Sequence, residues 1–237
     1  MEKRLLLISN STNYGEEYLG YTRTEIKNFL GTKYKNILFI PYAGVTVNWD
    51  DYTTKVANVF NSLGYGVVSI HSNTDPIDAV KDAEVIVVGG GNTFHLVYML
   101  HKTGIIKAIN DKVNSGTPYI GWSAGSNVAC PTLCTTNDMP VIQPESFNCI
   151  NLIPFQINPH YSDFVQPNHA GETREQRLSE YLKLNPDMNV VGLRESTMLK
   201  IEGPEIKLIG NRNMRYFRFG KESKEFTPND NINFLLQ

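Results

Sequence analysis

The chain has 237 residues, of which 41% are hydrophobic and 19% are charged, and its formal net charge is −2. This composition excludes an intrinsically disordered chain, which combines low hydrophobicity with high net charge. The near-neutral balance also gives no electrostatic case for a nucleic-acid partner or an anionic membrane surface.

The amino-terminal residues do not predict a secretory signal or a membrane anchor. The charged start is followed by an apolar run of only four residues, 5–8, and polar residues come directly after it. No stretch of the sequence is long enough to span a bilayer as a helix. The cysteines are odd in number, and a chain of this size does not need disulfides, so we expect reduced thiols and a cytoplasmic protein. These cysteines are Cys130, Cys134 and Cys149.

Short apolar runs alternate with amphipathic stretches through the first half. Runs rich in Ile, Val and Leu are typical of strands that a parallel sheet buries on both faces. The predicted strands are 5–9, 36–41, 66–70, 84–88 and 117–121, and the predicted helices are 17–30, 52–63, 93–100 and 105–113. This alternation predicts an α/β fold of three layers, α/β/α, with a mostly parallel sheet in a single domain over residues 1–237.

The second half is less regular. Residues 130–159 are rich in Pro, Thr and Asn and have no clear period, so we expect a functional loop or short strands there. A helix is predicted over 174–184. Short strands are predicted over 190–193, 197–201, 206–209 and 214–217.

The pentapeptide Gly-Trp-Ser-Ala-Gly at 121–125 carries the strongest chemical signal, because it matches G-x-S-x-G directly after a predicted strand. Chance placement in this composition would give about 0.08 such matches. In this motif a nucleophilic serine lies on a sharp strand-to-helix turn, and the glycines let strand and helix approach closely. Ser123 is therefore the predicted nucleophile. The structural alternative is a glycine-rich turn that needs only small residues.

Three consecutive glycines at 89–91 follow another predicted strand. Their spacing fails the G-x-G-x-x-G pattern of dinucleotide-binding folds because Phe94 occupies the position of the third glycine. No lysine follows as it does in a P-loop. Backbone N–H groups in such a turn can line a small anion site, as an oxyanion hole requires. A tight turn before a helix is the alternative.

A serine nucleophile needs a base within hydrogen-bond reach and a group that orients this base. The histidines in the region that reads as a helix after the glycines are expected to be surface or packing residues. His160 ends an apolar strand inside a rigid turn, where a sheet presents catalytic groups, and its position favours it as the base. The full set of candidates is His71, His95, His101, His160 and His169.

Two carboxylates fit the role of orienting acid. Glu195 follows the predicted strand 190–193, and Asp138 lies in the segment 130–159; either is also compatible with a solvated turn residue. Metal chemistry has little support, because the C-x₃-C spacing in this segment has no matching second pair and no H-E-x-x-H occurs. We therefore expect no metal and no other cofactor.

Several segments in the same order resemble the peptidase E family of serine peptidases, which also includes cyanophycinase. The resemblance runs from residue 5 to about residue 219. It rests on SNST (9–12), IPYAGVT (40–46), VGGGNTF (88–94), YIGWSAG (119–125), ACPT (129–132), TTNDMP (135–140), QINPH (156–160) and GETREQR (171–177).

The resemblance implies hydrolysis of dipeptides with an amino-terminal aspartate, Asp-X, in the cytoplasm and without a metal. It implies a fold like that of the class I glutamine amidotransferases. It also implies that Ser123 is the nucleophile, His160 the base and Glu195 the orienting acid, an order that differs from that of α/β-hydrolases. Asp138 matches an aspartate that the family also needs for activity, so it is a second candidate for a catalytic acid.

The expected mechanism adds an oxyanion site and a substrate-binding set. Backbone N–H groups of Gly91 and Ala124 are expected to stabilise the tetrahedral intermediate. The aspartate carboxylate of the substrate needs a cation with fixed geometry, for which the fork of Arg174 is the candidate.

Three further side chains are expected to bind the substrate. Asn92 and Thr173 are expected beside the aspartate, and Glu172 is expected to hold the substrate ammonium. The alternative for Glu172 is an acid at a helix amino terminus, which the helix dipole favours.

Other interpretations remain. An esterase, or a cyanophycinase-like enzyme for other aspartyl linkages, would use the same nucleophile. A non-catalytic sensor is disfavoured because the serine, the histidine and both acids are present, and the glycine spacing disfavours a dinucleotide-binding reductase. The expected partner is a small peptide, with no nucleic acid and no membrane. The sequence leaves the oligomeric state open, with a homodimer as one option.

Overall fold

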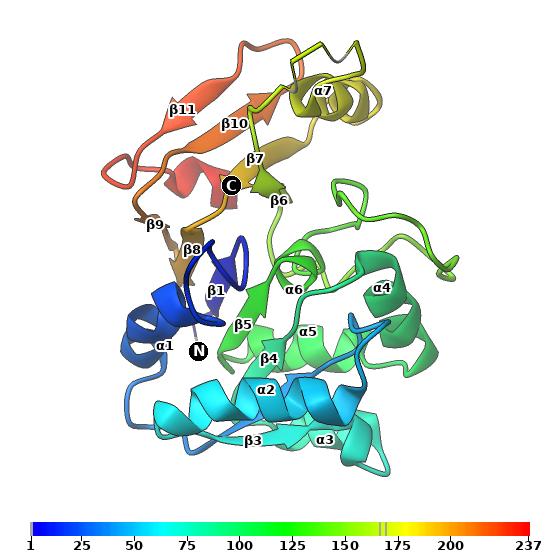
Figure 1. Ribbon diagram of the computed structural model, residues 1–237, viewed down its shortest axis with the longest axis vertical. Helices are drawn as coiled ribbons and strands as arrows, with labels where there is room; N and C mark the ends of the chain where they lie inside the picture. The colour runs from blue at the N-terminus through cyan, green and yellow to red at the C-terminus, as the bar shows by residue number, and fades with distance from the viewer. Residues whose placement is uncertain (1, 166, 169) are drawn as a thin grey trace.

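The computed structural model describes residues 2–165, 167–168 and 170–237, which form two β-sheets with helices around them (Figure 1). The strands are β1 (Arg4–Ile8), β2 (Asn36–Ile40), β3 (Gly66–Ser69), β4 (Ile86–Val88), β5 (Tyr119–Trp122), β6 (Gln156–Tyr161), β7 (Asn189–Arg194), β8 (Thr197–Glu202), β9 (Glu205–Gly210), β10 (Met214–Arg218) and β11 (Lys224–Phe226). The larger sheet has the order β3-β2-β4-β5-β1-β8-β9, and the smaller sheet has the order β11-β10-β7-β6.

The larger sheet is mostly parallel, as the sequence predicts. Strands β1 to β5 run parallel to one another, and the hairpin β8–β9 continues the sheet antiparallel at one edge. Each of the five predicted strands of the first half lies within two residues of its observed bounds. These strands could be predicted because a strand that is buried on both faces of a sheet needs a continuous apolar run, which is visible in the local sequence.

Helices cover both faces of the larger sheet and give the predicted three layers. The helices are α1 (Arg23–Leu30), α2 (Trp49–Ser62), α3 (Pro76–Asp82), α4 (Thr93–Lys102), α5 (Ile106–Asn114), α6 (Ala124–Asn127) and α7 (Arg174–Leu184), of which α7 lies on the smaller sheet. Tighter 3₁₀ turns lie at Gly20–Thr22, Ile70–Ser72 and Asn233–Leu236. The sequence analysis missed α3, which begins at a proline and is capped by the side chain of Asp75. Among the described residues, no helix is long and apolar enough to cross a membrane.

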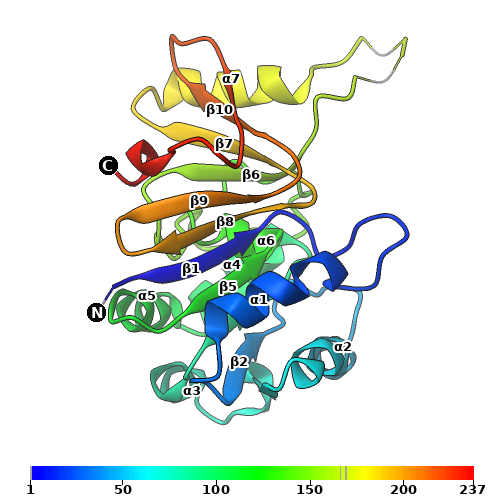
Figure 2. The same cartoon turned by 90° about the vertical axis from the view of Figure 1, so that its left-hand side faces the viewer.

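The alternation of side chains along β1 separates two cores. Leu6 and Ile8 pack in the same cluster as the buried residues of α1 and α2, whereas Leu5 and Leu7 pack in the cluster that contains α4 and α5. This follows from the period of two in a strand, which sends neighbouring side chains to opposite faces. The helices therefore lie on both sides of the sheet, as Figures 1 and 2 show.

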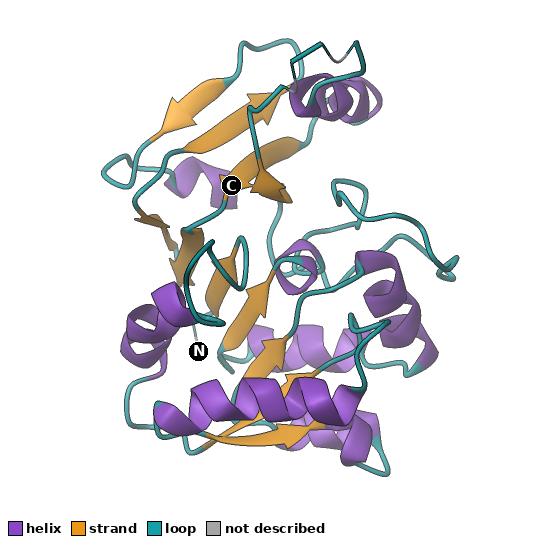
Figure 3. Cartoon of the chain, in the orientation of Figure 1, coloured by secondary structure: helices purple, strands orange, loops and turns teal. Residues whose placement is uncertain are grey.

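The smaller sheet lies beyond the β8–β9 edge of the larger one and carries α7 (Figure 2). The segment between α6 and β6 is almost entirely loop (Figure 3), as expected for much of residues 130–159. It leads into β6, which pairs in parallel with β7. The strand that carries His160, the predicted base, therefore directly follows this segment.

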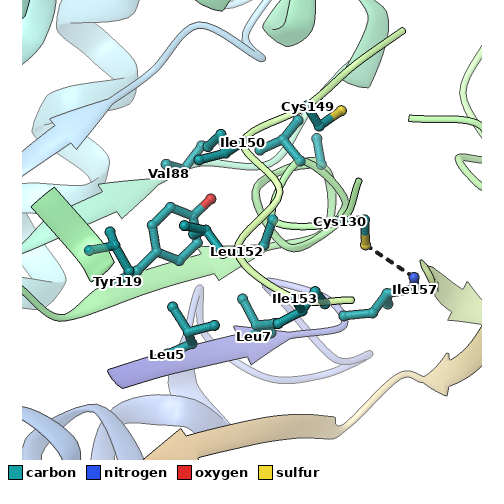
Figure 4. Packing of buried hydrophobic residues seen from close by; sticks show 14 of the residues in the cluster. Leu5, Leu7, Val88, Tyr119, Cys130, Cys149, Ile150, Leu152, Ile153 and Ile157 are labelled. Atoms are coloured by element: carbon teal, nitrogen blue, oxygen red, sulfur yellow. Dashed lines mark hydrogen bonds between the residues drawn. The ribbon is translucent and has the colours of Figure 1, made fainter. Parts of the chain in front are cut away.

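Buried contacts join the smaller sheet to the end of β5. The side-chain amide of Asn127, in α6, donates to the carbonyl oxygen of Ile157 in β6 at 2.8 Å. The N–H of Ile157 points to Cys130 Sγ at 3.1 Å, and both residues lie in the core shown in Figure 4. This cluster also contains Leu5 from the larger sheet and Val191 from the smaller one. The two sheets thus contribute to a common cluster, and one domain over residues 1–237 stays a prediction.

Candidate active site

Ser123 lies on a sharp turn between β5 and α6. Its backbone angles are φ 52° and ψ −114°, a sparsely populated conformation that costs about 1–3 kcal/mol for a residue with a side chain. Its N–H donates to the carbonyl oxygen of Ile8 at the end of β1 at 3.0 Å. A Cβ at Gly125 would clash with the carbonyl oxygen of Val88, so only glycine lets α6 start this close to β4. The second glycine of the motif is thus explained by packing.

A chain of hydrogen bonds joins Ser123, His160 and Glu195. His160 Nε2 lies 2.8 Å from Ser123 Oγ, and its Nδ1 lies 2.7 Å from Glu195 Oε1. The three side chains come from the turn after β5, the end of β6 and the turn that links β7 to β8. This arrangement is that of a nucleophile, a base and an acid that orients the base. The structure therefore brings together the three residues that the resemblance implies.

An irregularity in the β6–β7 pairing turns His160 toward Ser123. The register shifts between Pro159 and Tyr161, so His160 is the residue left out of the ladder, and its φ is 53°. A bulge of this kind redirects a side chain that regular pairing would send elsewhere. Ser196, directly after Glu195, also has a positive φ of 69°. Unusual backbone conformations thus occur at or beside each member of the chain.

Ser9 connects the strand ends that carry the base and the acid. Its buried hydroxyl accepts from the N–H of His160 at 3.0 Å and donates to the carbonyl oxygen of Leu193, two residues before Glu195, at 2.8 Å. Both backbone groups would otherwise need another partner. The sequence analysis assigned no role to Ser9, although it directly follows β1 at the same edge of the sheet as Ser123.

Replacing Ser9 with alanine should lower the free energy of unfolding by about 1–3 kcal/mol, because it leaves a backbone donor and acceptor unpaired at a buried site. Urea denaturation of the purified variant measures this loss. Ser11→Ala is the matched control, because the only side-chain partner of its hydroxyl among the described residues is Thr12 Oγ1 at 3.5 Å. Equal stability of the two variants would contradict the bridging role of Ser9.

Asn10 supports the turn that carries the acid. Its side-chain oxygen accepts from the N–H of Ser196 at 2.9 Å, and the hydroxyl of Tyr21 donates to Asn10 at 2.7 Å. Burial raises the pKa of Tyr21, and the nearby negative charge of Glu195 adds to this rise. The tyrosine therefore stays protonated and keeps donating. Sequence reasoning missed both supporting residues; the signal for Asn10 was a polar residue directly after a buried strand.

The turn after β4 carries Gly91, one of the two residues expected to form the oxyanion site. Gly91 has a φ of 139°, and a Cβ there would clash with the carbonyl oxygen of Ala43, so this position requires glycine. The N–H of Asn92 donates to the same carbonyl oxygen at 2.8 Å, and the Asn92 side chain caps α4 by accepting from the N–H of His95. Among the described residues, no acceptor takes the N–H of Gly91 or of Ala124. These are the two groups expected to face the oxyanion.

Asp138 does not contact His160 in this structure. Its carboxylate accepts from the N–H and the hydroxyl of Thr93, at 2.7 and 2.6 Å, at the first residue of α4. The neighbouring carbonyl of Met139 accepts from the side chain of Asn92 at 2.8 Å. Asp138 thus holds the segment beside Gly91, and it lies outside the hydrogen-bond chain of Ser123, His160 and Glu195.

Ser123 and His160 line a pocket of about 560 Å³. Its walls are the turn after β2 (residues 43–47), the glycine turn with Asn92, and a group of side chains from α2 and from the loop after β1. Lys55 is the only lysine or arginine among the described residues that line it, and none of them is Asp or Glu. The pocket therefore favours an anionic ligand. Sequence reasoning did not single out Lys55, since a lone lysine on a helix has no distinguishing pattern.

The structure places the other expected substrate-binding residues in a separate pocket of about 260 Å³. Thr173 caps α7 through a capping box with Gln176, and Glu172 lies 3.7 Å from Arg177. Arg174 is half-buried, and burial lowers its pKa. Its buried Nη1 has no hydrogen-bond partner within the described part of the chain. The structure thus does not bring this group to Ser123, although the Arg174 guanidinium keeps an unused donor.

Three of the other histidines form hydrogen bonds away from Ser123. The ring nitrogens of His71 form hydrogen bonds with the side chains of Ser69 and Asp50. His95 forms a hydrogen bond with the carbonyl oxygen of Tyr42, and His101 forms one with the carbonyl oxygen of Asn148. His169 lies outside the described residues. Over residues 2–165, 167–168 and 170–237, no group of three or more His, Cys, Asp or Glu side chains is arranged to hold a metal ion.

Comparisons with known proteins identify the family of the chain. The profile of peptidase family S51 matches residues 5–209. The chain is 60% identical over 237 residues to a peptidase E of Nostoc sp., covering 100% of this chain and 98% of that one. It is 45% identical over 219 residues to a peptidase E of Escherichia coli, covering 92% and 95% of the two chains.

Two solved structures share the fold. A protein described as a putative peptidase E from Listeria monocytogenes superposes with a TM-score of 0.69 at 23% identity, covering 89% of this chain and 100% of that one. A peptidase from an acI-B1 Actinobacterium gives a TM-score of 0.67 at 19% identity, covering 98% and 97%. The sequence matches show more than fold: the chain belongs to peptidase family S51 and is a serine-type peptidase.

Proposed function

We propose that this peptidase hydrolyses dipeptides with an amino-terminal aspartate, Asp-X, through an acyl-enzyme on Ser123. The observation that carries the catalytic part is the chain of hydrogen bonds from Ser123 through His160 to Glu195, at 2.8 and 2.7 Å. His160 takes the hydroxyl proton as Ser123 Oγ attacks the scissile carbonyl carbon, and it gives this proton to the departing amine. Water then hydrolyses the acyl-enzyme by the same exchange.

Glu195 and two backbone groups complete this proposed machinery. Glu195 holds the imidazole in the productive tautomer and stabilises the imidazolium that forms. The N–H groups of Ala124 and Gly91 donate to the carbonyl oxygen as it becomes negative, which is the largest single stabilising effect in acyl transfer. Asp138 keeps the Gly91 side of this site in place through its bonds to Thr93.

Selection for aspartate is assigned to Arg174, with Asn92, Thr173 and Glu172 as further binding residues. Of these, only Asn92 lines the Ser123 pocket, and the other three line a separate pocket. The resemblance to the family supports this assignment, as does the half-buried Arg174 guanidinium, whose Nη1 has no hydrogen-bond partner among the described residues and could donate to a carboxylate. The absence of Asp and Glu from the described lining of the Ser123 pocket also supports an acidic substrate.

We place the reaction in the cytoplasm. The three cysteines are free, and Cys134 is exposed, as suits a reducing compartment.

Purified protein should cleave Asp-Leu with a kcat/KM about 10²–10⁴ times that for Asn-Leu, because a neutral isostere would leave the half-buried guanidinium of Arg174 without a charged partner. Leu-Leu and Glu-Leu should also be slow, the latter because its carboxylate is one methylene farther out. Release of the free amino-terminal residue measures the rates, and Ser123→Ala, purified in parallel, excludes a contaminating peptidase. Similar rates on Asp-Leu and Asn-Leu would contradict the aspartate specificity.

A further inference from the structure

One wall of the Ser123 pocket presents Lys55, the one lysine or arginine among the described residues that line it. Lys55 lies on α2, one turn after Tyr52, and its exposed side chain lines the same pocket as Ser123 and His160. Its ammonium lies 4.1 Å from the centre of the Tyr18 ring. A cation over an aromatic face is held there while its N–H donors stay available to a ligand. No carboxylate among the described residues forms an ion pair with Lys55.

Hydrogen bonds connect this wall to the oxyanion side of the site. The Tyr18 hydroxyl lies 3.4 Å from the Tyr52 hydroxyl, which in turn donates to the carbonyl oxygen of Gly90 at 2.9 Å. The indole N–H of Trp122, the residue before the nucleophile, points to Tyr52 at 3.3 Å. The aromatic support under Lys55 is therefore fixed relative to the atoms that would surround the scissile carbonyl.

We propose that Lys55 binds the free carboxylate of the leaving residue of the dipeptide, an assignment that rests on the proposed Asp-X function. A dipeptide of this kind carries two carboxylates, and Arg174 is assigned to the aspartate side chain. The second carboxylate, at the carboxyl terminus, is present in every dipeptide whatever X is. Its position in the bound substrate shifts slightly with the size of X. The lysine ammonium, a point charge on a flexible side chain, can follow a carboxylate whose position varies, whereas the planar arginine guanidinium binds best to a carboxylate in one fixed position.

This role would also set the length of the substrate. Each added residue moves the terminal carboxylate by up to about 3.5 Å, beyond the reach that fits a dipeptide. Lys55 is then a specificity-determining residue that contacts the substrate and takes no part in proton transfer. Its contact is the same in the bound substrate and in the transition state, so its loss raises KM and leaves kcat nearly unchanged.

The test compares Asp-Leu with Asp-Leu amide, which differ only at the terminal carboxylate. Lys55→Met should lower kcat/KM for Asp-Leu by about 10-fold, mainly through KM, and should change the value for the amide by less than about twofold. Lys55→Arg should recover most of the loss. Lys107→Met is the matched control, an exposed lysine on α5 that lines a different pocket, and it should leave both substrates unaffected.

Each other outcome overturns the proposal in a recognisable way. An equal loss on acid and amide would mean that Lys55 acts on the aspartate half of the substrate or on the fold. Unchanged kinetics on both would mean that Lys55 contacts neither. A wild-type protein that cleaves neither Asp-Leu nor its amide would overturn the proposed function itself and this inference with it. Failure of the proposed function would therefore be seen with the wild-type protein, whereas failure of the Lys55 inference alone would be seen only with the variants.

Discussion

Replacing Ser123 with alanine should lower kcat for Asp-Leu by about 10⁶, because covalent catalysis is lost once the attacking oxygen is gone. His160 would then lie 2.8 Å from the former position of Ser123 Oγ with no hydroxyl proton to accept. Initial rates of aspartate release, measured with enough enzyme to detect slow turnover, give the size of the loss. Ser115→Ala, an exposed serine after α5, is the control that should keep full activity.

A double variant sharpens this test. Residues that act as one unit show strongly non-additive losses, so Ser123→Ala combined with His160→Ala should be no slower than Ser123→Ala alone. The thermal unfolding midpoint of each variant, followed by circular dichroism, establishes that the fold is kept. If the single variant retained near-wild-type turnover, Ser123 would not be the nucleophile, and the mechanism would have to be built on another residue.

Replacing Glu195 with alanine should lower kcat by about 10⁴, because the base loses the partner that fixes its tautomer and stabilises its charged form. The carboxylate is half-exposed and makes its described hydrogen bond to His160 Nδ1, so the stability of the fold should change little. Steady-state kinetics and urea denaturation of the same preparation measure both quantities. Glu195→Gln is the isosteric partner variant, and it should lose kcat as well, because a neutral amide cannot stabilise the imidazolium.

Asp138→Ala serves as the comparison for the acid. This carboxylate accepts two hydrogen bonds from Thr93 at the start of α4, so its loss should lower the free energy of unfolding by about 1–2 kcal/mol. Activity should fall less than in Glu195→Ala, through displacement of the turn that carries Gly91. If Asp138→Ala alone abolished kcat while Glu195→Ala remained active, the assignment of the acid would be wrong.

The bounds of helices and strands could be predicted closely where the local hydrophobic pattern alone determines them. Each parallel strand is an apolar run between polar boundaries, and α7 matches its predicted range of 174–184. The predicted helix over 17–30 begins only at Arg23, because residues 20–22 form a tighter 3₁₀ turn that the apolar period does not reveal. The seven-residue helix α3 escaped prediction because it is too short for a clear hydrophobic period.

Within the site, the sequence determined the chemistry of single positions. The G-x-S-x-G motif predicts a nucleophile at Ser123, and the position of His160 at a strand end favours it as the base, because both signals depend on the local backbone. The sequence left Glu195 and Asp138 as alternatives, since each is a carboxylate in a turn. Their roles separate only in space, where one accepts from His160 and the other from Thr93.

The tertiary structure alone decided which residues meet. Parallel pairing brings the ends of β1 and β5 side by side, the β6 bulge turns His160 inward, and the step from β7 to β8 carries Glu195 between the two sheets. Ser9 and Lys55 also lie at the site only because the fold brings them close to residues that are far away in the sequence. The physical reason is that hydrophobic period and turn chemistry act over a few residues, whereas strand order and register set distances across the whole chain.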